Sequence, residues 1–341
     1  MRTGKGNPSV SDTPALVGIG NAIVDVIARA QEEFLARHRL RKGTMRLIVA
    51  AQAEALYEDM GPGIEMSGGS VANSIAGFAM LGGRAAFIGK VAEDQLGEVF
   101  GHDIRSLGVH FATPPAPPPA TTARSLILVT PDAQRTMNTY LGASQMLNEH
   151  DLDEGLIARA EIVYLEGYLW DPPGAKRAFR RAIEVAKAAG TQVAFSLSDP
   201  FCVSRYRREF LELIDGGIDI LFANEEEAKT LLKVDTAEEA REALKSKVPI
   251  TALTRSEKGS WLIDRASGAV HEIPADPVER VEDTTGAGDL YAAGLLYGLT
   301  HGYALPQAGR IAARCAGEVV SHYGARPEAD LKRLVADIAR R

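Results

Sequence analysis

The sequence lacks the features that are typical of membrane, secreted and nucleic-acid-binding proteins. It contains two cysteines among 341 residues, Cys202 and Cys315, which form neither a disulfide framework nor a metal-ligand spacing. No apolar run reaches the ~18 residues of a transmembrane helix, and residues 1–13 lack the apolar stretch of a signal peptide. A formal net charge of −7 argues against a nucleic-acid partner. We therefore expect a cytoplasmic protein with reduced thiols and no contact with a membrane.

The motifs of several common enzyme classes are also missing. No GxxxxGK[ST] segment occurs, which excludes a P-loop NTPase. GxSxG and HExxH are absent, and the seven histidines form no pair at helical spacing. Gly18-Ile-Gly20 begins like a dinucleotide-binding fingerprint, but Ile23 stands where the third glycine belongs. This substitution argues against a Rossmann dehydrogenase.

What the sequence does contain is an alternation of apolar strand-like runs with helical patterns, from about residue 14 onward. With 45% hydrophobic and 24% charged residues, the composition is that of a globular enzyme. The alternation predicts an α/β fold with a mostly parallel central sheet flanked by helices. The predicted strands lie at 84–89, 161–165, 191–195, 218–222 and 250–253, and the predicted helices at 94–107, 175–189, 224–232, 287–300, 305–322 and 327–340.

Two stretches interrupt this alternation. Residues 22–50 contain short β-like pieces around a helical patch, and residues 122–141 read as a hairpin with turn chemistry at 130–133. Such insertions often cover the main sheet of an α/β chain. We expect a single domain over 14–338, with a small β lid formed by parts of 22–50 and 120–143.

The most informative segment is residues 281–289, Val-Glu-Asp-Thr-Thr-Gly-Ala-Gly-Asp, which precedes a helical pattern. It reads as a strand end, a glycine-rich turn and a helix start. The amides of Ala287, Gly288 and Asp289 would be free donors at the positive end of a helix, which suits a phosphate. The carboxylate of Asp289 could take a proton from a hydroxyl held beside that anion. Spacing alone fits an ordinary helix start equally well, with an Asp or Thr of the turn as its cap.

Residues 283–289 resemble the DTxGAGD signature of the ribokinase-like (PfkB) carbohydrate and nucleoside kinases at every fixed position. The resemblance implies a ribokinase-like fold with a small β-sheet lid. It also implies that Asp289 is the general base and that Gly286, Ala287 and Gly288 form an anion hole. Gly286 and Gly288, with Thr284, are then also expected to contact ATP phosphates.

A second glycine-rich segment, residues 65–73, precedes another helical pattern. It fits a helix start, or a close backbone approach to a polyhydroxylated ligand with the Asn73 amide as donor and acceptor. It resembles the family's sugar-binding GG-loop, in the GGSxxN form found in adenosine kinases; Val71 departs from the small residue of the broader family. The resemblance assigns four residues to the substrate: Gly68, Gly69, Ser70 and Asn73.

The resemblance to adenosine kinases covers about residues 15–328. Residues 20–25 resemble the GNxxxD opening, which assigns Asn21 and Asp25 to the substrate, because a carboxylate can accept from two adjacent ribose hydroxyls. Phe201, in LSDPF, stands where a Phe packs against the purine, although it also fits a core aromatic at a strand end.

The hairpin and the nucleotide side supply further assignments. Met137 and Leu141 stand where the lid contacts the base, and Arg135 where an Arg reaches phosphate. In 254–259 the resemblance is to the TxGxxG nucleotide loop, which assigns Thr254 and Gly259 to ATP, with Ser256 in place of the middle glycine. An ordinary hairpin turn also fits that segment.

Asn224 and Glu227 lie three residues apart at a helix start. The spacing is that of a capping box. It also matches the family's NxxE motif, which implies that Asn224 contacts ATP and that Glu227 holds Mg²⁺ through water. Both interpretations can hold together, since Mg²⁺ takes few protein carboxylates beside water and phosphate oxygens.

These observations lead to an ATP- and Mg²⁺-dependent kinase of a small molecule. The leading hypothesis is an adenosine kinase of purine salvage that phosphorylates the 5′-hydroxyl. The alternatives are a fructokinase or ribokinase type of sugar kinase, a kinase of another nucleoside, and, remotely, a nucleoside-binding module without catalysis. The sequence leaves open whether the protein is a monomer or a homodimer and whether it needs K⁺.

Overall fold

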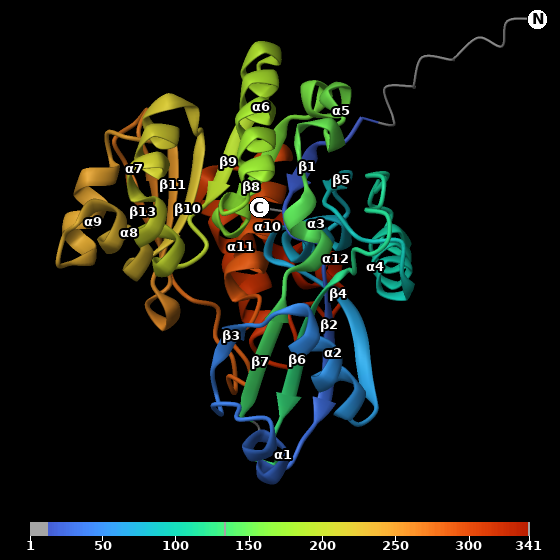
Figure 1. Cartoon of the computed structure of the whole chain (residues 1–341). Coiled ribbons are helices and arrows are strands. Elements are labelled where there is room, and N and C mark those ends of the chain that lie inside the picture. Colours follow the sequence, from blue (N-terminus) through green and yellow to red (C-terminus); the bar gives the residue numbers. More distant parts are fainter. Residues whose placement is uncertain (1–12, 133, 340–341) are drawn as a thin grey trace, which may run out of the picture.

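The computed structural model describes residues 13–132 and 134–339. Three predictions fall outside these ranges. They concern residues 1–12, where no signal-peptide pattern is expected, the turn residue Ala133, and Arg340 at the end of the last predicted helix. The described chain forms an eight-stranded sheet covered by helices and a separate five-stranded sheet, which projects below it in Figure 1.

The eight-stranded sheet confirms the predicted α/β class. Its strand order is β13-β12-β11-β10-β9-β8-β1-β5. The strands from β11 to β5 run parallel, and only β12 and β13 at one edge are antiparallel. The bounds are β1 (Leu16–Ile19), β5 (Ala85–Ile88), β8 (Ile162–Glu166), β9 (Gln192–Ser196), β10 (Ile220–Asn224), β11 (Ile250–Thr254), β12 (Ser260–Asp264) and β13 (Val270–Ile273).

Helices cover both faces of this sheet. Successive strand residues point to opposite faces, so Leu16 packs in one hydrophobic cluster and Val17 in the other. The first cluster includes α3 (Ser70–Met80), α4 (Gln95–Ser106), α10 (Ala287–Thr300) and α11 (Leu305–Val319). The second includes α5 (Glu154–Arg159), α6 (Pro173–Ala189), α7 (Pro200–Gly217), α8 (Glu225–Leu232) and α9 (Ala237–Leu244). Short 3₁₀ turns are η2 (Gly142–Met146), η3 (Glu149–Asp151), η4 (Gly167–Trp170) and η5 (Ser256–Lys258).

The five-stranded sheet has the order β3-β7-β6-β2-β4. The hairpin predicted at 122–141 is β6 with β7, and the region 22–50 supplies β2 and β3. The edge strand β4 was not predicted, because its sequence, GIEMSG, has glycines at both ends and only four residues of alternation between them. The bounds are β2 (Ile23–Arg29), β3 (Met45–Leu47), β4 (Gly63–Gly68), β6 (Ala123–Val129) and β7 (Arg135–Tyr140), with α1 (Glu32–Arg37) and α2 (Ala50–Asp59) beside them.

Two predicted elements differ in the structure. The segment before the glycine-rich turn is a loop over residues 274–286, not a strand end. The Glu282 N–H donates to the carbonyl of Val320 at the end of α11, not to a neighbouring strand. The helix predicted at 327–340 is two short helices, α12 (Leu331–Leu334) and α13 (Ala336–Ala339). The first of them begins at Leu331, four residues after the predicted start, because the Asp330 side chain accepts from the Arg333 amide and caps the helix there. Within the described ranges, no helix is both long and apolar enough to cross a bilayer.

The contact between α10 and α11 depends on small residues, which gives a test of the packing. A Cβ added to Gly294 would lie 2.6 Å from the Ala312 Cα. We therefore expect Gly294→Ala to lower the free energy of unfolding by ~1–3 kcal/mol through overpacking. Gly216 in α7 has no described atom within 4 Å of the same position, so Gly216→Ala should be neutral or stabilising, by up to ~1 kcal/mol. Urea unfolding of both variants measures this difference, and equal effects would contradict the packing argument.

Candidate active site

The predicted base lies where two helices begin. Asp289 is in the first turn of α10, whose N-cap is Gly286 with φ +81°. A side chain at Gly286 would meet the backbone of Ala325 at 2.8 Å, so the turn requires glycine there. The opposing helix, α3, brings Ser70 and Asn73 to the same carboxylate. The structure therefore joins the two glycine-rich segments of the sequence at Asp289.

Both carboxylate oxygens of Asp289 accept hydrogen bonds from α3. Ser70 Oγ donates to Oδ1 at 2.6 Å and Asn73 Nδ2 to Oδ2 at 2.9 Å. Ser74 Oγ donates to the Asp289 main-chain oxygen at 2.9 Å. Burial raises the pKa of Asp289 to about 6, while the two side-chain hydrogen bonds lower it. A carboxylate with such a pKa is ionised near neutral pH and is basic enough to accept a proton.

Two of the three predicted anion donors remain available. The amide of Ala287 donates to the Thr284 carbonyl at 3.2 Å, so the prediction of three free N–H groups was wrong for this residue. Among the described residues, no backbone carbonyl accepts from Gly288 or Asp289 N–H. A Cβ at Gly288 would meet no atom within 4 Å, so the turn is open at this point. The first turn of α10 can therefore receive an anion.

Arg135 lies beside this turn, paired with a carboxylate. Its Nη1 is 2.6 Å from Oδ2 of Asp283, and both side chains are buried. Oδ1 of Asp283 accepts from the amide and the hydroxyl of Thr285, which fixes the turn. The guanidinium also lies over the Tyr323 ring, at 5.0 Å from its centroid. The ion pair thus joins β7 of the small sheet to the glycine-rich turn.

The small sheet brings Asp25 to the second glycine-rich loop. A Cβ at Gly68 would lie 2.5 Å from Oδ2 of Asp25, and one at Gly69, where φ is +101°, would lie 2.2 Å from the Asn21 carbonyl. Only glycine permits both approaches. Burial raises the pKa of Asp25 to about 7, and the charges of Arg326 and Arg135 lower it.

The strand register shows which lid residues share a face with Asp25. Asp25 pairs with Ser125, and Ser125 with Thr139. Met137, two residues before Thr139, therefore points to the same face. Leu141 follows directly after β7, at the start of η2.

Asn21 is held by a residue that sequence reasoning missed. Its backbone N and its Nδ2 both donate to Oε1 of Glu166, at 2.7 and 2.6 Å. The only sequence signal for Glu166 is an acidic residue that ends an otherwise apolar strand, β8.

Phe201 does not pack in the core. It is 80% exposed near the start of α7, beyond the carboxyl end of β9. Tyr168, in η4 after β8, is a second exposed aromatic at the carboxyl ends of the strands, and the sequence reading did not include it. Ligands of open α/β sheets bind at this edge.

The residues assigned to ATP and metal lie beyond β10 and β11. Asn224 and Glu227 form a capping box: Asn224 Oδ1 accepts from the Glu227 amide, and Glu227 accepts from the Asn224 backbone N and Nδ2. Thr254 ends β11, and its hydroxyl donates to the Ala223 carbonyl at 3.4 Å. Ser256 has φ +51°, a conformation that favours glycine, which agrees with its standing where the family has one.

The Glu227 carboxylate fits a cation. It is 5% exposed, and burial raises its pKa to about 7. Among the described residues, no Lys or Arg forms an ion pair with it. No group of three or more His, Cys, Asp or Glu side chains forms a metal cage in the same part of the chain. A buried, uncompensated carboxylate without a cage suits Mg²⁺ that keeps waters and phosphate oxygens as its other ligands.

Comparisons with known proteins agree with this geometry. The family model described as pfkB family carbohydrate kinase matches residues 65–331. The chain belongs to this family. It is therefore a phosphotransferase that acts on a hydroxyl group.

Relatives within the family include both nucleoside and sugar kinases. The adenosine kinase of Sinorhizobium meliloti is 48% identical, with a TM-score of 0.88, over 95% of this chain and 99% of that one. A probable sugar kinase of Rhizobium etli CFN 42 is 44% identical, with a TM-score of 0.88, over 96% and 99% of the two chains. The probable fructokinase-6 of Arabidopsis thaliana is 31% identical over 70% of this chain and 64% of its own length.

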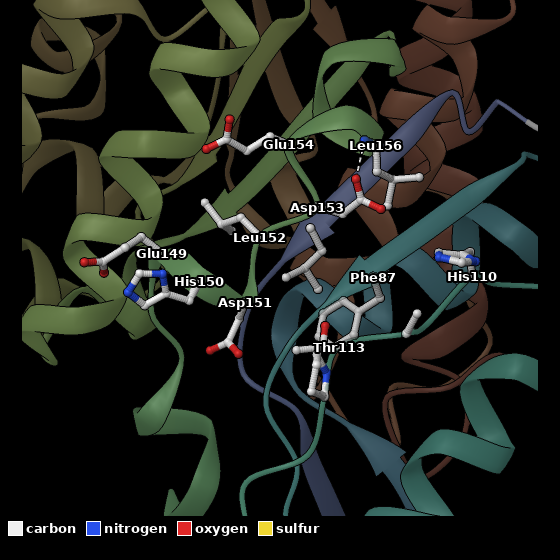
Figure 2. Close-up of a pocket in the computed structure, with 13 residues that line it drawn as sticks. Phe87, His110, Thr113, Glu149, His150, Asp151, Leu152, Asp153, Glu154 and Leu156 are labelled. Atoms are coloured by element: carbon white, nitrogen blue, oxygen red, sulfur yellow. Dashed lines mark hydrogen bonds between the residues drawn. The ribbon is translucent and has the colours of Figure 1, made fainter. Parts of the chain in front are cut away.

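A separate cavity of about 510 Å³ lies between the end of β5 and η3 (Figure 2). None of the residues assigned to the kinase site lines it. Three of its four acidic side chains have basic partners: Asp151 pairs with Lys90, Glu149 with Arg177 and Glu154 with Arg181. The fourth, Asp153, caps α5 by accepting from the Leu156 amide. This cavity is therefore not the site of phosphoryl transfer.

The pH dependence of the kinase tests the assignment of the base. A base acts in its ionised form, so kcat/KM should fall as the pH drops through about 6, the pKa of Asp289. Asp25 also titrates in this range, so the pH profile alone does not show which carboxylate causes the fall of kcat/KM at acid pH. A variant at Ser70 distinguishes them. Ser70→Ala removes a donor to the ionised form and should move the acid limb to higher pH. The Ser74 hydroxyl donates to the main-chain oxygens of Asp289 and Ser70 and not to the Asp289 carboxylate, so Ser74→Ala should leave the limb in place. A limb that does not move in Ser70→Ala would contradict the assignment.

Proposed function

We propose that the protein is an ATP-dependent adenosine kinase that phosphorylates the 5′-hydroxyl of adenosine and yields AMP. The observation that carries the proposal is the Asp289 carboxylate, held by Ser70 and Asn73 beside the open first turn of α10. A proton acceptor and an anion site within one helical turn are what in-line phosphoryl transfer to a hydroxyl requires. The similarity to an adenosine kinase over nearly the whole chain supports this acceptor.

In this mechanism Asp289 accepts the proton of the attacking hydroxyl. Asp25 and Asn73 bind the ribose hydroxyls and orient the 5′-carbon toward Asp289. The Asn73 Oδ1 atom is buried and has no described partner, so it can accept from a ligand hydroxyl. Asn21, Gly68 and Gly69 keep the loop close enough for these contacts.

The amides of Gly288 and Asp289 receive the transferring phosphoryl group, and Thr284, Gly286 and Ala287 form the turn that presents them. Nε and Nη2 of Arg135 lack hydrogen-bond partners among the described residues, so they remain available to phosphate oxygens. Asn224 and Glu227 would hold Mg²⁺ through water, and Mg²⁺ when bound neutralises phosphate charge. Thr254 and Gly259 line the nucleotide side, and K⁺ is a further candidate ion there.

The base of adenosine would contact apolar side chains. We assign Phe201 to one face, and Met137 and Leu141 of the small sheet to the other. The regions 22–50 and 120–143, with β4, act as a lid over the acceptor within a single domain spanning 14–338. Closure of this lid would exclude water, which competes as an acceptor.

The substrates are diffusible small molecules, so the protein needs neither a nucleic acid nor a membrane as partner. We propose a cytoplasmic enzyme of purine salvage that acts as a monomer or a homodimer.

A sugar kinase is the second candidate. Asp25 and Asn73 bind hydroxyls of a sugar as readily as those of a nucleoside, and a probable sugar kinase is 44% identical to this chain. The exposed Phe201 favours a nucleoside, because a purine offers the ring a flat aromatic face to stack on and fructose or ribose does not. A screen of adenosine, inosine, guanosine, ribose and fructose with Mg²⁺-ATP distinguishes the two candidates.

Replacing the base tests the chemistry whatever the acceptor is. Asp289→Asn keeps the side-chain shape but cannot take the proton. We expect kcat to fall by ~10²–10⁴, with the affinity for ATP nearly unchanged. Steady-state kinetics and ATP binding by calorimetry measure both quantities. A kcat close to that of the unmodified enzyme would contradict the mechanism.

Replacing Phe201 tests the choice of adenosine. The stacking of a ring on a base is worth ~0.5–1.5 kcal/mol beyond its buried area. Phe201→Ala should therefore raise KM for adenosine several-fold, with little effect on any activity toward ribose. Phe201→Leu keeps an apolar side chain without the flat ring. Its KM for adenosine should lie between those of the unmodified protein and Phe201→Ala. Equal losses on adenosine and ribose would give Phe201 a purely structural role, and better turnover of fructose than of adenosine would overturn the purine acceptor.

A further inference from the structure

Glu166 is a buried carboxylate for which the proposed reaction has no role. It ends β8, next to the carboxyl end of β1, and its exposed fraction is 0%. Oε1 accepts from the backbone N and Nδ2 of Asn21, at 2.7 and 2.6 Å. Oε2 accepts from the Val71 amide at 2.8 Å. One side chain therefore connects the segment after β1 to the first turn of α3.

The bond to Val71 replaces a helix cap that α3 lacks. Its N-cap is Gly69, which has no side chain and forms no side-chain cap. The first amides of a helix have no acceptor within the helix, so a buried start needs one from elsewhere. The Glu166 carboxylate supplies this acceptor, and its negative charge suits the positive end of the helix.

The position of Glu166 requires a glycine beside it and buries its negative charge. A Cβ at Gly20 would lie 2.7 Å from Oε2, so glycine at that position makes space for the carboxylate. Burial raises the pKa of Glu166 to about 7, and the bonds from Asn21 and Val71 lower it. Among the described residues, no Lys or Arg pairs with it. A buried carboxylate without a cation is costly, which argues that it serves more than packing.

We propose that Glu166 is a positioning residue for phosphoryl transfer, which fixes the start of α3 so that Ser70 and Asn73 hold the Asp289 carboxylate. Ser70 precedes Val71 directly, and Asn73 follows it by two residues, so a shift of the Val71 amide displaces both donors to Asp289. Glu166 does not touch the acceptor, because its oxygens are occupied and buried. The proposal rests on the proposed kinase function, and its test separates the two.

Glu166→Gln is the first variant. The amide keeps the shape of the carboxylate, but its NH₂ must face either the Val71 N–H or the Asn21 donors. With misplaced donors on Asp289, we expect kcat to fall about 10- to 100-fold. KM for ATP should change less than about twofold, because Asn224 and Thr254 lie on other strands. The assay uses whichever acceptor the unmodified protein phosphorylates best, so a different acceptor does not affect the result.

Hydrogen exchange provides a measurement that does not depend on activity. In Glu166→Gln the amides of Asn21 and Val71 should exchange faster, while those of β11 and β12 should not change. Faster exchange with a normal kcat would overturn the positioning role and leave the kinase function standing. An unmodified protein that phosphorylates no acceptor would instead refute the proposed function.

A matched control separates positioning from loss of stability. Phe179→Leu removes volume from the opposite hydrophobic cluster, where Phe179 is fully buried. If Phe179→Leu lowers Tm as much as Glu166→Gln does, Phe179→Leu should still retain kcat. Equal losses of kcat in the two variants would overturn the proposal. If Glu166→Gln does not fold, Gly20→Ala replaces it, since the added methyl pushes against Oε2. Its kcat should fall while KM for ATP holds, and unchanged kinetics in that variant would contradict the proposal.

Discussion

The site depends on one contact, in which the first turns of α3 and α10 meet at the Asp289 carboxylate. The two helices pack closely: a Cβ on Gly77 of α3 would lie 2.5 Å from the Leu290 side chain, so the approach requires glycine. This approach lets Ser70 and Asn73 reach both oxygens of Asp289. The start of α10 also leaves the N–H groups of Gly288 and Asp289 without a backbone acceptor among the described residues, so they can receive an anion. Helix packing thus decides where the proton acceptor lies relative to the phosphate.

Around this contact the protein buries more negative than positive charge. Asp25, Glu166 and Asp289 all have pKa values raised by burial, to about 7, 7 and 6. The nearby cation is Arg326, whose own pKa burial lowers to about 10 while it donates to Ser67 and Ala72. Such a site is poised to accept protons and to receive hydroxyl donors. Arg135 brings a second cation from the small sheet, and Asp283 balances its charge.

Local patterns predicted much of this structure, because strands and helices follow from periodicity and caps. Gly190 ends α6 in the left-handed conformation, as its place after a helical pattern indicates, and the capping box of Asn224 forms as its spacing predicts. Contacts between distant segments were not predictable in this way. Glu166 lies 145 residues from Asn21, and nothing in the local sequence of β8 reveals that partner. The missed β4 gains its register from β2, and the exposure of Phe201 depends on how α7 is placed, so neither is a local property.

The position of the new phosphate ester tests the central claim most directly, because Asp25 and Asp289 would hold opposite ends of the ribose. The protein is incubated with Mg²⁺-ATP and adenosine, and the product is examined by ³¹P NMR with proton coupling. A hydroxyl held at Asp289 while the other hydroxyls bind Asp25 should give the 5′-monophosphate alone, whose phosphorus couples to two methylene protons. A 2′- or 3′-phosphate, or transfer only to free sugars, would contradict the account.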